Sequence, residues 1–234
     1  MSGNRLLGKD FPHGMIQIAG VLDADEGRML LEEGADWLGF PIGLTVHTEE
    51  IEPAGARRIV DRLSLKDRGV LITYLDTARE ILDLCRTVGL RRVQLHEEVP
   101  VTEIARLRAA EPGLFIMKSL VVRESGAEDL DTLLRAYQPF VDAFITDTYD
   151  SETSACGATG KTHDWGISRR LVERSFRPVV LAGGLGPHNV HEAIVRVRPT
   201  GVDVHTGLER PDGRKSRSLA RAFVGEARRA FGDQ

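Results

Sequence analysis

The sequence predicts an α/β fold in which eight βα units close into a single (β/α)8 barrel. Short runs rich in β-branched residues alternate with longer segments of helical period, and this alternation repeats eight times. Dividing the 234 residues by eight leaves about 29 residues for each unit, which matches a minimal βα repeat. Because no Pro/Gly/Ser-rich linker interrupts the pattern, we expect one domain over residues 1–234.

Each expected strand is short and apolar, and an expected helix follows it. The strands are expected at 16–19, 37–40, 70–74, 92–95, 115–121, 143–146, 179–182 and 202–205. The helices are expected at 24–33, 54–65, 77–88, 101–110, 127–137, 165–174, 188–196 and 216–230, with Asp164 as an N-cap. An open doubly wound sheet is the alternative, but it usually has fewer strands. No GxGxxG motif follows the first expected strand, which also disfavours it.

The composition and charge of the chain argue against several classes of binding partner. With 41% hydrophobic residues, 28% charged residues and a formal charge of −4, the chain lacks the positive field that attracts nucleic acid or anionic membranes. Cys85 and Cys156 form no CxxC pair, so we expect no metal site, no cofactor and a reducing cytoplasmic location. Neither a secretory signal nor an apolar run of the roughly 18 residues needed to span a membrane is visible.

Two glycine-rich turns follow the seventh and eighth expected strands, where barrels of this kind commonly hold a phosphate. Gly183 and Gly184 follow the seventh strand, and they let backbone N–H groups approach an anion. His205, Thr206 and Gly207 follow the eighth and add a side-chain donor, a hydroxyl and an N–H. A single glycine-rich turn is often just the turn before a helix, with no ligand bound. Two such turns on adjacent loops, however, predict a phosphorylated small-molecule ligand.

Over nearly its whole length the chain resembles the phosphoribosylanthranilate isomerase family of tryptophan biosynthesis. The resemblance rests on segments 33–40, 93–96, 146–148, 157–165, 181–185 and 201–209, taken together and in order. It implies a TIM barrel that performs an Amadori rearrangement, in which an aminofuranose opens and an aldose-derived imine becomes an aminoketose. In this family an aspartate that Asp147 matches acts as general acid on the ring oxygen.

The first departure from the family lies at the end of the first strand. There the family has a cysteine that takes the C2 proton, whereas this chain has Ala19. Three side chains are candidate replacements: His96, which also matches the family's Gln-Leu-His segment, His47 and the loop cysteine Cys156. Ala19, Gln94 and His47 are expected to line the substrate, and Asp147 and His96 to be catalytic.

The second departure follows the second strand, where the family carries Ser-Pro-Arg and uses the arginine near the anthranilate carboxylate. Here segment 43–50 contains His47, Glu49 and Glu50 instead, so an aromatic carboxylate lacks its bidentate partner. His205 likewise stands where the family has a serine. The phosphoribosyl half of the substrate is therefore better supported than the anthranilate half.

Three functions remain open from the sequence. The first is an isomerase of a phosphorylated aminosugar, acting as a monomer or homodimer. The second is a divergent lyase, aldolase or epimerase on a sugar phosphate, and the third is a phosphate-ligand binder without catalysis. Asp203, inside the last expected strand, is interpreted as structural.

Overall fold

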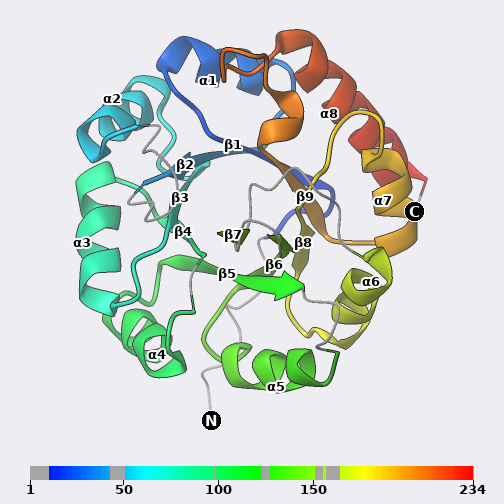
Figure 1. The fold of residues 1–234 in the computed structure, drawn as a ribbon. Helices are drawn as coiled ribbons and strands as arrows, with labels where there is room; N and C mark the ends of the chain where they lie inside the picture. The colour runs from blue at the N-terminus through cyan, green and yellow to red at the C-terminus, as the bar shows by residue number, and fades with distance from the viewer. Residues whose placement is uncertain are drawn as a thin grey trace.

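The computed structural model describes residues 11–42, 51–96, 98–122, 127–150, 155–156 and 164–233. In this part of the chain, eight parallel strands form a closed ring with eight α-helices around it (Figure 1). The ring runs β5-β4-β3-β2-β1-β9-β8-β6, and pairing of β5 with β6 closes it. The predicted (β/α)8 barrel is confirmed.

The strands of the ring are β1 (Met15–Ala19), β2 (Trp37–Pro41), β3 (Gly69–Thr73), β4 (Arg92–Leu95), β5 (Phe115–Val122), β6 (Ala143–Asp150), β8 (Val179–Leu181) and β9 (Gly201–Val204). The helices are α1 (Ala24–Glu32), α2 (Pro53–Leu63), α3 (Ala78–Val88), α4 (Val101–Ala110), α5 (Ala127–Tyr137), α6 (Trp165–Arg174), α7 (Val190–Val197) and α8 (Arg217–Gly232). All these bounds lie within a few residues of the expected ones, except at β6.

The strand β6 extends to Asp150, whereas the sequence predicted an end at residue 146. A two-residue strand, β7 (Ala155–Cys156), pairs with it antiparallel through Tyr149 and Asp150, so the extension belongs to a hairpin. The prediction stopped early because the polar residues from Asp147 onward break the apolar pattern. Asp147 consequently lies within a strand, opposite Val121 of β5, rather than after one.

Two apolar layers surround the strands. The larger layer packs the outer faces of the strands against the helices. A smaller cluster, which includes Met15, Ala19, Met117 and Ile145, fills the inside of the ring. Strand alternation places Gln17 and Asp203 on that same inner side, and Gln17 Nε2 donates to Gln94 Oε1 at 3.0 Å across the interior.

An aromatic cluster packs at the end of the ring where the strands begin. Phe11 contacts the rings of Trp37 and Phe115, the first residues of β2 and β5, and the Arg92 guanidinium lies 4.8 Å from the centre of the Trp37 ring. Because this end is packed with side chains, the ligand site is expected at the opposite end, where the strands finish.

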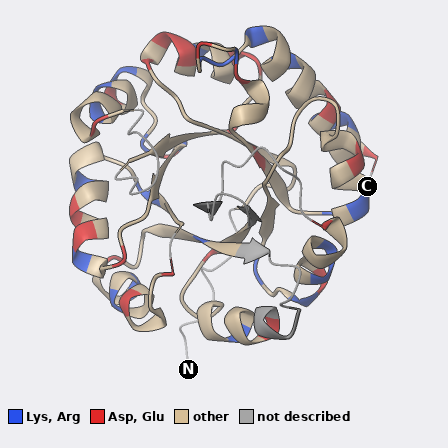
Figure 2. Ribbon diagram, viewed as in Figure 1, with Lys and Arg blue, Asp and Glu red and all other residues tan. Residues whose placement is uncertain are grey.

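Lys, Arg, Asp and Glu residues are concentrated on the outer helices, while the strands around the axis carry few of them (Figure 2). Among the described residues, none of the helices combines the length and the apolar character that a membrane span requires. The described part also contains no group of three His, Cys, Asp or Glu side chains arranged to hold a metal ion.

Candidate active site

The loop between β8 and α7 is built on glycines whose conformation other residues rarely adopt. Gly183 has φ +96° and Gly184 has φ +60°. Asn189 braces this loop, because its Oδ1 accepts from Gly186 N at 2.8 Å and its Nδ2 donates to Gly184 O at 2.9 Å. The side chain at the helix start thus fixes the turn.

The loop that follows β9 lies directly against this one. Gly207 belongs to a short 3₁₀ helix, η1 (Thr206–Leu208), and a Cβ placed on it would lie 2.0 Å from the carbonyl oxygen of Leu185. Only a residue without a side chain permits such an approach between two backbones. The structure therefore brings together the two glycine turns that the sequence predicted as a phosphate cradle.

The ends of β1 and β9 lie side by side. Ala19, the last residue of β1, points its methyl group into the ring and is 2% exposed. Ile18 pairs with Val204, so the next residues along the two strands are Ala19 and His205. The Nε2 atom of His205 lies 2.2 Å from the position that a Cβ on Gly20 would occupy, so the imidazole rests against the backbone that follows Ala19.

His205 faces a partly buried ion pair, between Glu209 and Lys215, that the sequence did not suggest. Its Nε2 lies 3.3 Å from Glu209 Oε1, and Lys215 Nζ lies 2.7 Å from the same oxygen. The nearby His205 and Lys215 lower the pKa of Glu209 to about 2, against the opposing effect of burial. The sequence spacing could have predicted this pair, because Glu209 comes four residues after His205 at the strand end and the chain can turn back between them.

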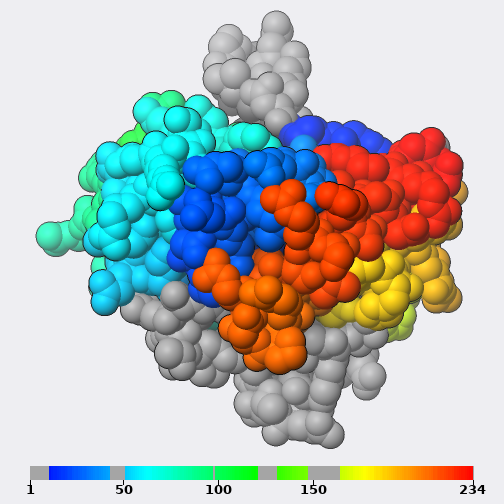
Figure 3. Space-filling model, turned by 90° about the horizontal axis from the view of Figure 1, so that it is seen from above, coloured from blue at the N-terminus to red at the C-terminus, as the bar shows by residue number. Residues whose placement is uncertain are grey.

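A second carboxylate, that of Glu26, links the first helix, α1, to the segment that precedes the last helix, α8. Glu26 is 4% exposed and accepts from the backbone N–H groups of Leu22 and Lys215. Arg214 also pairs with Asp23, the N-cap of α1. Figure 3 shows the orange segment before α8 lying against the blue segment of α1. These contacts hold the loop carrying Glu209 and Lys215 beside the end of β1.

The other predicted residues on the inner wall lie on β4. Gln94 is 4% exposed and bonds to Gln17 below the mouth of the barrel. His96 follows β4, with its Nδ1 3.1 Å from Ser119 Oγ and its ring packed edge-on against Tyr74. Its orientation is therefore fixed by neighbours on β5 and β3.

Three predicted side chains lie outside the described part of the structure. The loop with His47, Glu49 and Glu50 is not among the described residues. Asp147 and Cys156 are described only through the backbone of β6 and β7. Their roles stay predictions.

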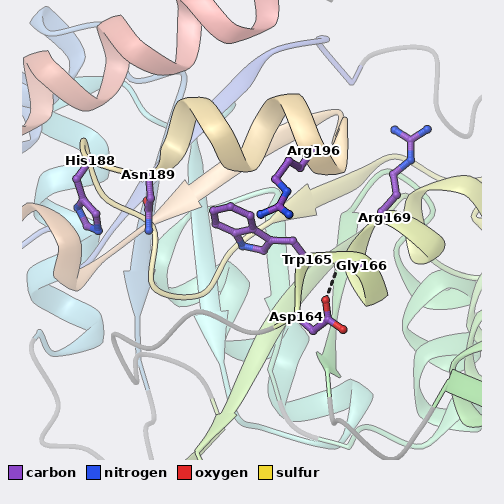
Figure 4. Close-up of a pocket in the computed structure, with 7 residues that line it drawn as sticks. All are labelled: Asp164, Trp165, Gly166, Arg169, His188, Asn189 and Arg196. Carbon is purple, nitrogen blue, oxygen red and sulfur yellow. Dashed lines mark hydrogen bonds between the residues drawn. The ribbon is translucent and has the colours of Figure 1, made fainter.

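A hollow of about 680 Å³ lies between α6 and α7, behind the glycine loop. In Figure 4 the Trp165 indole lies beside the Arg196 guanidinium, while Arg169 points away from both. Each arginine pairs with a glutamate of its own helix, Glu173 or Glu192. Asp164 Oδ1 accepts from Gly166 N at 2.7 Å, the bond marked by the dashed line in Figure 4, and this confirms the predicted N-cap of α6. Among the described residues that line the hollow, both arginines are therefore held by glutamates of their own helices.

Comparison with known proteins places this geometry in a family. The model of the N-(5'-phosphoribosyl)anthranilate isomerase family matches residues 51–226. The chain belongs to this family. It is 38% identical over 220 residues to N-(5'-phosphoribosyl)anthranilate isomerase 2 of Methanosarcina mazei, covering 92% of this chain and 95% of that protein. It is 37% identical to the isomerase of Haloferax volcanii, covering 93% and 94% of the two chains.

Solved structures of this isomerase family superpose well on the chain. The enzyme of Thermotoga maritima gives a TM-score of 0.76 at 30% identity and covers 92% of this chain and 98% of its own. A family member solved with reduced 1-(o-carboxyphenylamino)-1-deoxyribulose 5-phosphate gives 0.73 at 28% identity, with the same coverage. Ala19 and His205, two positions where the sequence was interpreted as departing from this family, lie at or just after the ends of paired strands and are neighbours in space.

Proposed function

We propose that the chain isomerises N-(5'-phosphoribosyl)anthranilate, or a close phosphorylated aminoribose, to the corresponding aminoketose by acid–base catalysis. The observation that carries this proposal is the contact between two glycine loops at the ends of β8 and β9, in a chain of this isomerase family. Acid–base chemistry at a barrel mouth needs neither a metal nor a redox cofactor.

The phosphate is assigned to the backbone of the two loops. The N–H groups of Gly183, Gly184 and Gly207, with the Thr206 hydroxyl, would donate to its oxygens. The sequence adds His205 to this set. Its Nε2 lies 3.3 Å from Glu209 Oε1, and its contact with the phosphate stays a prediction.

The chemistry begins with Asp147, which would protonate the ring oxygen as the C1–O bond breaks and an iminium forms between C1 and nitrogen. Loss of the C2 proton then leaves an enolamine, which tautomerises to the ketone. His96, held by Ser119 and Tyr74, is assigned to contact the opened sugar and exchange a proton with it. Gln94, Ala19 and His47 would line the same cavity.

A second candidate is a phosphate-ligand binder without turnover. The methyl side chain of Ala19 favours it, because an alanine cannot take a proton. The glycine cradle is equally compatible with this function, so only a measurement of turnover separates the two candidates.

The assembly and location are proposed on weaker grounds. A Thermotoga maritima relative is described as dimeric, and we propose a monomer or homodimer for this chain as well. A reaction of amino-acid biosynthesis and the lack of paired cysteines fit the cytoplasm. Sedimentation of the purified chain measures the assembly directly.

The deciding experiment gives the purified chain N-(5'-phosphoribosyl)anthranilate and follows formation of the aminoketose by chromatography. Turnover above the spontaneous rate supports the isomerase. Carbon–carbon cleavage, or deuterium wash-in without ketose, would indicate the lyase or epimerase alternative. Calorimetric binding of the phosphorylated ligand with no product at high protein concentration would establish a binder.

A further inference from the structure

A further hollow, of about 420 Å³, lies at the end of the barrel where the strands begin. Its walls are the last turns of α3 and the loops that lead into β3, β4 and β5. α3 and α4 are neighbours in the ring of helices beside it (Figure 1). The hollow is therefore separate from the mouth, where the two glycine loops and His96 lie.

The floor of this hollow is apolar. Leu82, Leu90 and Leu114 line it and are 4–7% exposed. Cys85 lies among them at 3% exposed, and burial raises the pKa of its thiol to about 12, so it is neutral. A polar group placed on such a floor would lose its hydrogen bonds to water. The floor therefore favours an apolar group.

Three cations from separate segments surround the floor. Lys66 precedes β3, Arg86 belongs to α3, and Arg91 precedes β4. Arg86 Nη1 lies 3.8 Å from Asp83 Oδ1, at the limit of an ion pair, and within the described residues no carboxylate pairs with Lys66 or Arg91. A sphere of the hollow's volume is about 9 Å across, close to the Debye length of about 8–10 Å, so salt only partly screens their repulsion. A bound carboxylate would relieve it.

One carboxylate shares the rim with these cations. Glu111 follows α4, and its Oε1 lies 3.8 Å from where a Cβ would stand on Gly113, another residue of the wall. In the part of the chain that the structure describes, Glu111 has no cation within ion-pair distance. The rim thus offers both signs of charge, and they are not paired with one another.

We propose that this hollow binds a free amino acid with an apolar side chain. The carboxylate of the ligand would contact Lys66 and Arg91, its ammonium would contact Glu111, and its side chain would cover the leucines of the floor. The volume lies within the range of about 300–1,000 Å³ that is usual for small-molecule pockets. Because the site lies at the opposite end of the barrel from the phosphate cradle, it does not depend on the proposed rearrangement.

A bare inorganic anion is the competing occupant. It would use the cations, but it would leave the apolar floor uncovered and would be repelled by Glu111. The hollow of about 680 Å³ between α6 and α7 is the alternative place for an organic ligand. There Arg169 and Arg196 are already paired with glutamates, at 2.7 Å and 3.2 Å, so the hollow beside α3 has the better claim to a carboxylate.

The test is calorimetric titration of the purified chain with L-phenylalanine. We expect one site per chain with a Kd of about 0.1–1 mM, because contacts to exposed charges are individually weak. Two analogues each lack one charged contact: L-phenylalaninamide has no carboxylate, and 3-phenylpropionate has no ammonium. Each is expected to bind about three- to tenfold more weakly than L-phenylalanine.

Substitutions on the rim locate the site. Lys66→Gln and Arg91→Gln are each expected to weaken L-phenylalanine binding about three- to tenfold. Glu111→Gln should weaken L-phenylalanine but not 3-phenylpropionate, which has no ammonium to lose a partner. Arg79→Gln is the matched control, because Arg79 lies on the same helix as Arg86 but outside the hollow, with its side chain 92% exposed. All four side chains are exposed, so the variants should fold, and circular dichroism checks this.

The outcomes separate this site from the catalytic proposal. No binding of L-phenylalanine to the folded, unchanged chain overturns the site, and so does binding that the three rim variants leave unchanged. Equal affinity for 3-phenylpropionate, or for sulfate, overturns the assignment to an amino acid. Turnover without L-phenylalanine binding removes this inference alone, whereas rim-dependent binding in a chain without turnover removes only the proposed function.

Discussion

The two sides of the barrel mouth differ in whether backbone groups or side chains form the expected site. Where the loops after β8 and β9 meet, the expected phosphate cradle consists of backbone, with Gly207 packed on the Leu185 carbonyl and the Asn189 side chain bracing the turn. Beside β1 and β4 the site consists of single side chains at or just after the strand ends, such as Ala19 and His96. A backbone cradle keeps its function through many side-chain changes, whereas one substitution removes a catalytic group. The difference explains how a chain can keep a glycine cradle while the side chain at the end of a neighbouring strand changes.

The largest expected effect is at Asp147, on the side-chain part of the mouth. Asp147→Asn is expected to lower kcat by about 10²- to 10⁴-fold with little change in KM, because an amide cannot protonate the ring oxygen. Steady-state kinetics check this, with Asp131→Asn on the surface of α5 as control. A raised KM at constant kcat would instead show that Asp147 binds substrate and leave the acid unassigned.

The next effect tests the ion pair beneath His205. Folding lowers the pKa of Glu209 from 4.5 to about 2, so its ionised form contributes stability that is present above pH 4.5. That contribution, about 3 kcal/mol at 1.36 kcal/mol per pKa unit, is lost as the pH falls from 4.5 toward 2. Urea unfolding at pH 6 and pH 3 should therefore show a smaller acid loss in Glu209→Gln than in the unchanged chain. Equal acid losses in the two proteins would contradict the pairing.

The sequence predicts the backbone side of the mouth better than the side-chain side. Glycine turns such as the one at Gly183 and Gly184 can be predicted from the sequence, because few other residues adopt φ near +96° or +60°. The order of the strands follows from the alternating pattern of strands and helices. The contact of Gly207 with Leu185 and the pairing of His205 with Glu209 depend instead on how two loops meet. Periodicity carries no information on that meeting, so Glu209 and Lys215 were missed.

A smaller effect is expected when the contact between the glycine loops is broken. Gly207→Ala puts a methyl group into the Leu185 carbonyl, so the loops must separate at a cost of about 1–3 kcal/mol. KM and the inhibition constant of inorganic phosphate should rise together while kcat changes little. Gly225→Ala is the matched control, because no atom lies within 4 Å of a Cβ there. Unchanged phosphate inhibition in Gly207→Ala would remove the cradle from the phosphate site.

The smallest expected effect is at Asn189, which braces the turn without being assigned to the phosphate. Asn189→Ala removes two hydrogen bonds: the one that Asn189 accepts from Gly186 N and the one that it donates to Gly184 O. Each is worth about 0.5–1.5 kcal/mol. Part of that loss should appear as a rise in KM of about five- to thirty-fold, since a loosened turn must be reordered by the bound phosphate. Asn189→Asp keeps the acceptor for Gly186 N but sets an oxygen against Gly184 O, so it should also weaken phosphate inhibition. If His188→Ala, the adjacent change in the same loop, raised KM as much, the effect would belong to the loop as a whole and not to the brace.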